Sequence, residues 1–167
     1  MLTLLNKLLE DGNTLFKRNK LPEAVQRYQY AVKRVPQLPA GDRQHKPVFD
    51  QLRIHLLLNL ARCKRKMCDL SECIRLTNQV LELNPSCYQA LHARAKAHHA
   101  NGDLQLAVND LTQAIRMAPH NRELHRILVN TKQELVAKSD NDKFMLNIIN
   151  DSHDSSSGVS SNLEITE

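Results

Sequence analysis

A repeat with a period of 34 residues restricts the fold of this chain more than any other feature of its sequence. Pro85 and Pro119 lie 34 residues apart, and each ends a run with helical character, as does Pro36. Small residues recur 5, 12 and 24 positions before each of these prolines. They are Ala31, Ala24 and Gly12 in the first copy, Val80, Cys73 and Ala61 in the second, and Ala114, Ala107 and Ala95 in the third. Because small residues allow two antiparallel helices to pack closely, each copy predicts a helical hairpin.

The composition agrees with an all-α chain of one domain. A length of 167 residues is enough for one hydrophobic core, and four glycines and six prolines are too few for the many turns of a β-sandwich or barrel. Aromatic residues make up only 4% of the chain and tryptophan is absent, so Leu, Ile, Val and Ala must fill the core.

The spacing of the prolines also divides the chain. The three copies cover about residues 5–38, 54–87 and 88–121, and an insertion, residues 39–53, separates the first two. We expect the first part of the insertion to be a loop. The second part has apolar residues at helical spacing and is expected to lengthen the helix that follows. An apolar stripe then predicts a capping helix over residues 122–138 that covers the end of the stack.

Charge divides the chain into a basic body and an acidic tail. Residues 1–138 carry a net charge of +10, whereas residues 139–167 carry a net charge of −5. The tail is rich in Ser, Asp and Asn, and we expect it to be disordered. Its apolar segment, Phe144–Ile149, either continues the capping helix or forms a short docking motif. A further hypothesis is that the tail folds over a basic surface of the body and inhibits binding there.

The sequence lacks the patterns typical of an enzyme active site or a cofactor site. It holds no glycine-rich phosphate loop and no motif of a zinc protease or a serine hydrolase. His98 and His99 are adjacent on a predicted helix and point in different directions, which does not suit a metal site. We therefore expect a non-enzymatic protein with no catalytic residues, no cofactor and no metal ion.

The cysteines and the apolar runs indicate the compartment. Neither the spacing of a zinc site nor a signal peptide is present, so we expect buried thiols at Cys63, Cys68, Cys73 and Cys87. No apolar run approaches the ~20 residues of a membrane span. These features predict a soluble, cytoplasmic protein.

The repeat resembles the tetratricopeptide repeat (TPR) in its period, its small residues and its terminal proline. The resemblance implies a right-handed superhelical solenoid of three helical hairpins plus a capping helix. The first helix of each hairpin then lines the concave surface, which is the usual binding surface of such solenoids. We therefore predict a peptide-binding groove that holds apolar Leu9, Phe16 and Leu58 beside polar Asn6, Asn13, Lys17, His55, Asn59, Arg62, Arg65, Lys66, Gln89, His92, Lys96 and His99.

The predicted groove is basic, because its polar residues include five Lys or Arg and no acid. Such a surface suits an extended acidic or phosphorylated peptide, which lysine and arginine hold through charge-assisted hydrogen bonds. One alternative is a solvated basic face without a fixed ligand. Another is a nucleic-acid site at Arg62, Lys64, Arg65 and Lys66, which we expect less because no aromatic stacking platform accompanies these cations.

TPR co-chaperones bind the C-terminal carboxylate of heat-shock proteins through a clamp of Lys, Asn, Asn, Lys and Arg. Asn13 and Asn59 match its two asparagines, whereas its three cations are replaced by Leu9, Gln89 and Ala93. Asparagines alone cannot neutralise two carboxylates. We therefore predict an adaptor or scaffold for an acidic peptide, with a co-chaperone that uses an altered clamp as the alternative, and we expect a heat-shock protein C-terminus less.

Longer runs are similar to the TPR segment of the TANC (rolling pebbles) scaffold proteins. They cover residues 27–31 (RYQYA), 56–67 (LLLNLARCKRKM) and 88–95 (YQALHARA). The resemblance extends over about residues 5–138. It implies a protein that organises assemblies at the cell cortex or at postsynaptic sites.

Overall fold

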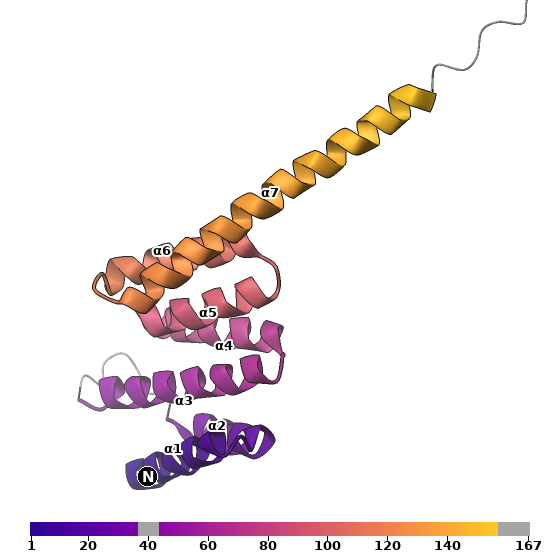
Figure 1. The fold of residues 1–167 in the computed structure, drawn as a ribbon. Coiled ribbons are helices and arrows are strands. Elements are labelled where there is room, and N and C mark those ends of the chain that lie inside the picture. Colours follow the sequence, from indigo (N-terminus) through magenta and orange to yellow (C-terminus); the bar gives the residue numbers. More distant parts are fainter. Residues whose placement is uncertain (37–43, 157–167) are drawn as a thin grey trace, which may run out of the picture.

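The computed structural model describes residues 1–36 and 44–156, and for residues 147–156 it describes the backbone only. Seven helices lie in this part of the chain, and no strand does. They are α1 (Leu2–Lys17), α2 (Leu21–Arg34), α3 (Lys46–Lys66), α4 (Leu70–Leu83), α5 (Tyr88–Ala100), α6 (Leu104–Met117) and α7 (Arg122–Ser156). The pairs α1–α2, α3–α4 and α5–α6 stack one on the next, and α7 packs on α6 (Figure 1). The prediction of an all-α stack of three hairpins and a further helix is confirmed.

The small residues of the repeat lie where two helices of a hairpin meet. All nine are buried. At Gly12 the approach is closest, because a Cβ there would overlap the ring of Tyr28, which is 1% exposed. The equivalent positions of the third copy are Ala95 and Leu111. The first hairpin thus pairs a glycine with a tyrosine, whereas the third hairpin pairs an alanine with a leucine at the equivalent positions.

The turn inside each hairpin has the same backbone geometry. Asn19, Cys68 and Gly102 have φ angles of 58°, 60° and 83°. In each case the next residue donates its N–H to the carbonyl oxygen five residues before it, at 2.9 Å. This arrangement ends the first helix with a left-handed residue and turns the chain into the second. Cys68 is therefore exposed in a turn, which corrects the expectation of four buried thiols, while the remaining three cysteines are buried.

The insertion between the first two copies lengthens α3. This helix has 21 residues, whereas α1 has 16 and α5 has 13. Pro47 lies in its first turn, where the missing N–H of proline costs no hydrogen bond. The start of the expected loop, residues 39–43, lies outside the described residues.

Helix α7 has 35 residues and continues well past the expected end of the capping helix. Leu124 and Thr131 are buried, whereas Phe144, Met145 and Leu146 are between 52% and 63% exposed. The distal part of the helix projects away from the stack (Figure 1). The expectation of disorder is wrong for residues 139–156, which continue the helix because neither proline nor glycine interrupts it. Residues 157–167 lie outside the described residues.

The disposition of α7 also bears on the tail hypothesis and on membrane insertion. Residues 139–156 lead away from the stack rather than folding over it (Figure 1). Within the residues that the structure describes, no helix has the length and apolar character needed to cross a membrane.

Candidate peptide-binding groove

The first helix of each hairpin, together with α7, lines one face of the stack. Helix α3 contacts both α1 and α5 in addition to its hairpin partner α4. Hollows open between these helices in two places. We call the space between α1 and α3 the first furrow and the space between α5 and α7, closed on one side by Arg65 of α3, the second furrow.

A chain of hydrogen bonds forms the floor at the centre of the first furrow. The Tyr28 hydroxyl donates to Asn13 Oδ1 at 2.8 Å, and Asn59 Nδ2 donates to the same oxygen at 3.0 Å. Burial raises the pKa of Tyr28 well above its ordinary value, so its hydroxyl remains a donor. The Asn13 amide nitrogen and the Asn59 amide oxygen have no hydrogen-bond partner among the described residues, and both side chains are half-buried. Together they offer donors and an acceptor, which one backbone peptide group of a ligand can satisfy.

Three cations surround this floor at the end of the furrow near the hairpin turns. Lys17 and Arg62 line a hollow of about 370 Å³ with Asn13, Phe16 and Asn59. Lys66 Nζ lies 4.5 Å from the centre of the Phe16 ring, a cation–π contact. All three cations are exposed, and none forms an ion pair with an acid of the described residues. They are therefore open to an anionic ligand.

The other end of the first furrow has more apolar than polar lining residues. A hollow of about 540 Å³ lies between the N-terminal parts of α1 and α3. Its lining residues are Leu2, Asn6, Leu9, Pro47, Val48, Gln51, Leu52 and His55. Gln51 Nε2 lies 3.2 Å from His55 Nε2 at the rim. Leu9, at a position where the co-chaperone clamp has a lysine, thus belongs to an apolar wall.

The second furrow contains acids that the sequence prediction did not include. Lys96 Nζ lies 3.5 Å from Glu123 Oε1, and His99 Nε2 lies 2.8 Å from Glu134 Oε2. Both glutamates come from α7, which also contributes Arg126 to this furrow. The expectation of a groove without acids is therefore wrong, because α7 lines the groove as well as covering the end of the stack.

His92, on α5, is only partly accessible. Its Nε2 atom is buried and has no hydrogen-bond partner in the described part of the chain. Burial lowers the pKa of His92, and the nearby positive charge of Lys96 lowers it further. The imidazole is therefore neutral near pH 7.

The structure removes Leu58 from the predicted groove. Its side chain is only 9% exposed and belongs to the hydrophobic core, because α3 is packed against neighbours on several sides. Gln89 is exposed at the start of α5, where its Oε1 lies 3.6 Å from Cys87 Sγ. Arg65 and Lys96 lie together at the second furrow.

Arg94, one residue after the clamp position at Ala93, has a structural role. Its guanidinium donates to both carboxylate oxygens of Asp110 at 2.8 and 2.6 Å and to Asn78 Oδ1 at 2.7 Å. Asp110 is 5% exposed. The hydrogen bond to Asp110 raises the pKa of Arg94. This cation joins α4, α5 and α6, and it cannot replace the arginine of the clamp.

The period of the repeat also predicts the groove residues of α7 that are absent from the predicted groove. Adding the period of 34 to Gln89, His92 and Lys96 gives Glu123, Arg126 and Asn130. All three lie at the second furrow. Extending the template by one more helix would have placed them on the binding face.

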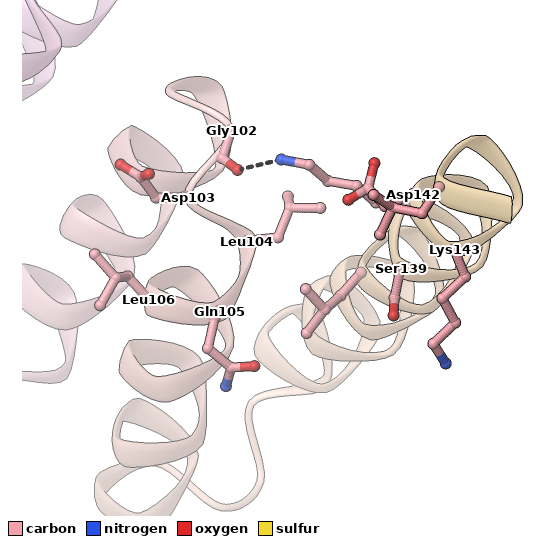
Figure 2. Close-up of a pocket in the computed structure, with 11 residues that line it drawn as sticks. Gly102, Asp103, Leu104, Gln105, Leu106, Ser139, Asp142 and Lys143 are labelled. Atoms are coloured by element: carbon pink, nitrogen blue, oxygen red, sulfur yellow. Dashed lines mark hydrogen bonds between the residues drawn. The ribbon is translucent and has the colours of Figure 1, made fainter. Parts of the chain in front are cut away.

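A further hollow, of about 440 Å³, lies between the start of α6 and the middle of α7 (Figure 2). Leu104 and Leu106 line one side and Ser139, Asp142 and Lys143 the other. Across it Lys138 Nζ reaches the Gly102 carbonyl oxygen at 3.4 Å. Because α6 is the second helix of its hairpin, this hollow is separate from both furrows.

No group of three or more His, Cys, Asp or Glu side chains that could hold a metal ion occurs in the described part of the chain.

Comparison with models of known protein families gives no match. Among curated proteins, the chain is 30% identical over 112 residues to the peptidyl-prolyl cis-trans isomerase PASTICCINO1 of Arabidopsis thaliana. The matched segment covers 67% of this chain and 18% of that protein. It is 28% identical over 126 residues to the human peptidyl-prolyl cis-trans isomerase FKBP4, covering 75% of this chain and 28% of the relative. The chain thus spans less than a third of the length of these two relatives.

Solved structures share the fold. The C-terminal TPR-containing domain of a Plasmodium falciparum FK506-binding protein superposes with a TM-score of 0.72 at 24% identity, over 83% of this chain and 92% of that one. The fold is a TPR fold. The first TPR domain of Spaghetti (RPAP3), bound to the HSP90 peptide SRMEEVD, gives a TM-score of 0.65 at 24% identity, over 80% and 94% of the two chains. The second TPR domain of human RPAP3, in complex with the HSP70 peptide SGPTIEEVD, gives 0.63 at 21% identity, over 78% and 96%.

The relatives described above are FKBP-like proteins and RPAP3. They support the TPR part of the sequence prediction and give no support to the narrower resemblance to the TANC scaffold proteins.

Proposed function

We propose that this chain is a peptide-binding TPR module that holds an extended acidic peptide in its first furrow. The observation that carries the proposal is the oriented amide floor of Asn13 and Asn59, surrounded by the cations Lys17, Arg62 and Lys66. The amides suit the backbone of an extended peptide, whose N–H and C=O groups are unpaired. The cations suit its carboxylates.

The C-terminal segment of a heat-shock protein is the ligand that we now place first. The sequence alone favoured an unrelated acidic partner, because three cations of the co-chaperone clamp are replaced. Two TPR domains similar to this chain hold HSP90 or HSP70 peptides that end in Glu-Glu-Val-Asp. The first furrow keeps both asparagines of the clamp and has cations at other positions. These observations support an altered clamp.

The remaining expectations from the sequence stay predictions. They include a wider role as adaptor or scaffold, the absence of enzymatic activity and of a cofactor, membership of the TANC family, and a location in the cytoplasm, at the cell cortex or at postsynaptic sites. The division into repeats at residues 5–38, 54–87 and 88–121 also stays a prediction.

The proposed function is tested by titrating the full chain into fluorescein-labelled SRMEEVD and following the anisotropy. We expect saturable binding that the Asn59→Asp variant weakens about tenfold, because a carboxylate in the floor repels the acidic peptide. Asn109→Asp is the matched control, since it makes the same change on an exposed position of α6. The control should bind like the unmodified chain.

Two results would overturn the proposal. One is the absence of saturable binding to the peptide by the unmodified chain. The other is an equal loss of affinity in both variants, which would mean that net charge rather than the first furrow decides binding. Circular dichroism of each variant checks that the helical fold is retained.

A further inference from the structure

The first furrow changes character along its length, and this change specifies a ligand more narrowly than acidity does. The inference rests on the proposed function and concerns the side chains that the furrow selects. At one end, five of the eight lining residues are apolar, namely Leu2, Leu9, Pro47, Val48 and Leu52, and the other three are Asn6, Gln51 and His55. The opposite end has Lys17 and Arg62, with the amide floor between the two.

The apolar end cannot hold a carboxylate as the co-chaperone clamp does. Of the eight described residues that line this hollow, none is Lys or Arg. Leu2 is 40% exposed and Val48 is 49% exposed, so apolar surface is open to a ligand there. An apolar side chain gains by leaving water for such a surface, whereas a carboxylate would lose its hydration without a cation in return.

The two ends lie at a fixed separation because the same two helices carry both. Leu9 and Lys17 are eight residues apart on α1, which corresponds to about 12 Å along a helix. An extended peptide advances about 3.3 Å per residue. It therefore spans the distance with about four residues.

We propose that the first furrow recognises an apolar side chain and an acidic side chain about four residues apart in an extended segment, and does not require a free C-terminal carboxylate. The apolar side chain enters the hollow at Leu9 and Val48. The acid meets Lys17 and Arg62, and the intervening backbone meets Asn13 and Asn59. Position 9 thus decides whether this end of the furrow selects an apolar group or an anion.

Three labelled peptides test the inference on the full chain. They are SRMEEVD with a free C-terminus, the same peptide with a C-terminal amide, and the peptide with its methionine replaced by serine. In the first peptide the methionine and the final aspartate are four residues apart. We expect the loss of methionine to weaken binding about tenfold and amidation to weaken it by less than about threefold.

Two variants carry the test further. Leu9→Lys puts a charge at the end of the furrow assigned to methionine and should abolish the preference for it, so that the loss of methionine weakens binding by less than about threefold. Val48→Ser changes an exposed residue and should remove the dependence on methionine without changing the thermal midpoint. The second variant keeps the test valid if the partly buried position 9 does not tolerate lysine.

The outcomes separate this inference from the proposed function. Saturable binding in which amidation costs more than the loss of methionine overturns the apolar subsite and leaves the proposed function intact. Unchanged dependence on methionine in Val48→Ser also overturns it. No binding of any of the three peptides overturns both.

Discussion

The two furrows both contain cations, but they present them to a ligand in different ways. In the first furrow Lys17, Arg62 and Lys66 surround a hydrogen-bonded floor and have no acid of the described residues beside them. In the second, Lys96 lies beside Glu123. A cation that already pairs with an acid attracts an anionic ligand less strongly. The number of cations in a groove is therefore a poor measure of the charge that a peptide meets.

The difference between the furrows originates in what lies opposite each first helix. The first furrow is formed by α1 and the lengthened α3, whose facing residues are amides, cations and apolar groups. The second is formed by α5 and α7, and α7 brings both Glu123 and Glu134. The helix that closes the stack thus offsets part of the positive charge of this furrow.

The largest expected effect is the loss of the floor of the first furrow. Gly12→Ala forces a Cβ into the ring of the buried Tyr28, and overpacking of this kind costs about 2 kcal/mol. We expect a lower thermal midpoint by circular dichroism and weaker peptide binding. The double variant Gly12→Ala/Tyr28→Leu recreates the residue types of the third copy and should recover the stability but not the binding. If Gly12→Ala melts at the same temperature as the unmodified chain, the close approach does not support the floor.

The next effect compares the cations of the two furrows directly. Arg62→Ala/Lys66→Ala removes two cations of the first furrow and should weaken the binding of SRMEEVD about tenfold. Lys96→Ala removes a cation that Glu123 already pairs with and should change the affinity less than about twofold. Isothermal titration calorimetry measures both. An equal loss from Lys96→Ala would mean that the peptide extends over the second furrow.

A smaller effect should follow from releasing Lys96. Glu123→Gln removes its acidic partner and should tighten the binding of an acidic peptide about two- to threefold, because the freed cation attracts the ligand. Glu23→Gln, at an exposed position of α2, makes the same change in net charge away from both furrows. A gain in affinity of the same size in both variants would assign the effect to net charge.

The smallest effect concerns the partly buried His92 of α5. Its pKa in the folded chain lies below the ordinary value of 6.5, so the unfolded chain binds more protons as the pH falls through this value. Stability should therefore fall as the pH is lowered from about 7 toward 5.5, and His92→Gln should lose less stability over this range. Urea unfolding at both pH values measures the difference, with the exposed His120→Gln as control. Equal losses in the unmodified chain and in His92→Gln would contradict the burial of this imidazole.

Much of the fold follows from spacing in the sequence. The small residues at three offsets from Pro36, Pro85 and Pro119 are all buried between helices, as expected from close helix packing. The positive φ angles of Asn19, Cys68 and Gly102 recur at the same spacing, although glycine is present at only one of them. The position of a residue within the repeat therefore predicts these turns better than the type of residue does.

The site was less predictable, because its chemistry depends on distances between helices of different copies. The hydrogen bond from Asn59 to Asn13 joins residues 46 positions apart, and the repeat gave no indication that one amide would orient the other. Leu58 was expected in the groove but is buried, since helical spacing does not show how closely the next hairpin covers a residue. The acids of α7 were not predicted, because the apolar stripe of this helix indicates only a cover for the end of the stack.

The most direct test of the account is which furrow the peptide occupies. Asn13 and Asn59 lie in the first furrow and Asn130 in the second, so their side-chain amides report on the two sites in one NMR experiment. On addition of unlabelled SRMEEVD to the ¹⁵N-labelled chain, the account predicts shifts of the Asn13 and Asn59 side-chain NH₂ signals and a constant Asn130 signal. A shift of the Asn130 signal while those of Asn13 and Asn59 remain constant would contradict it.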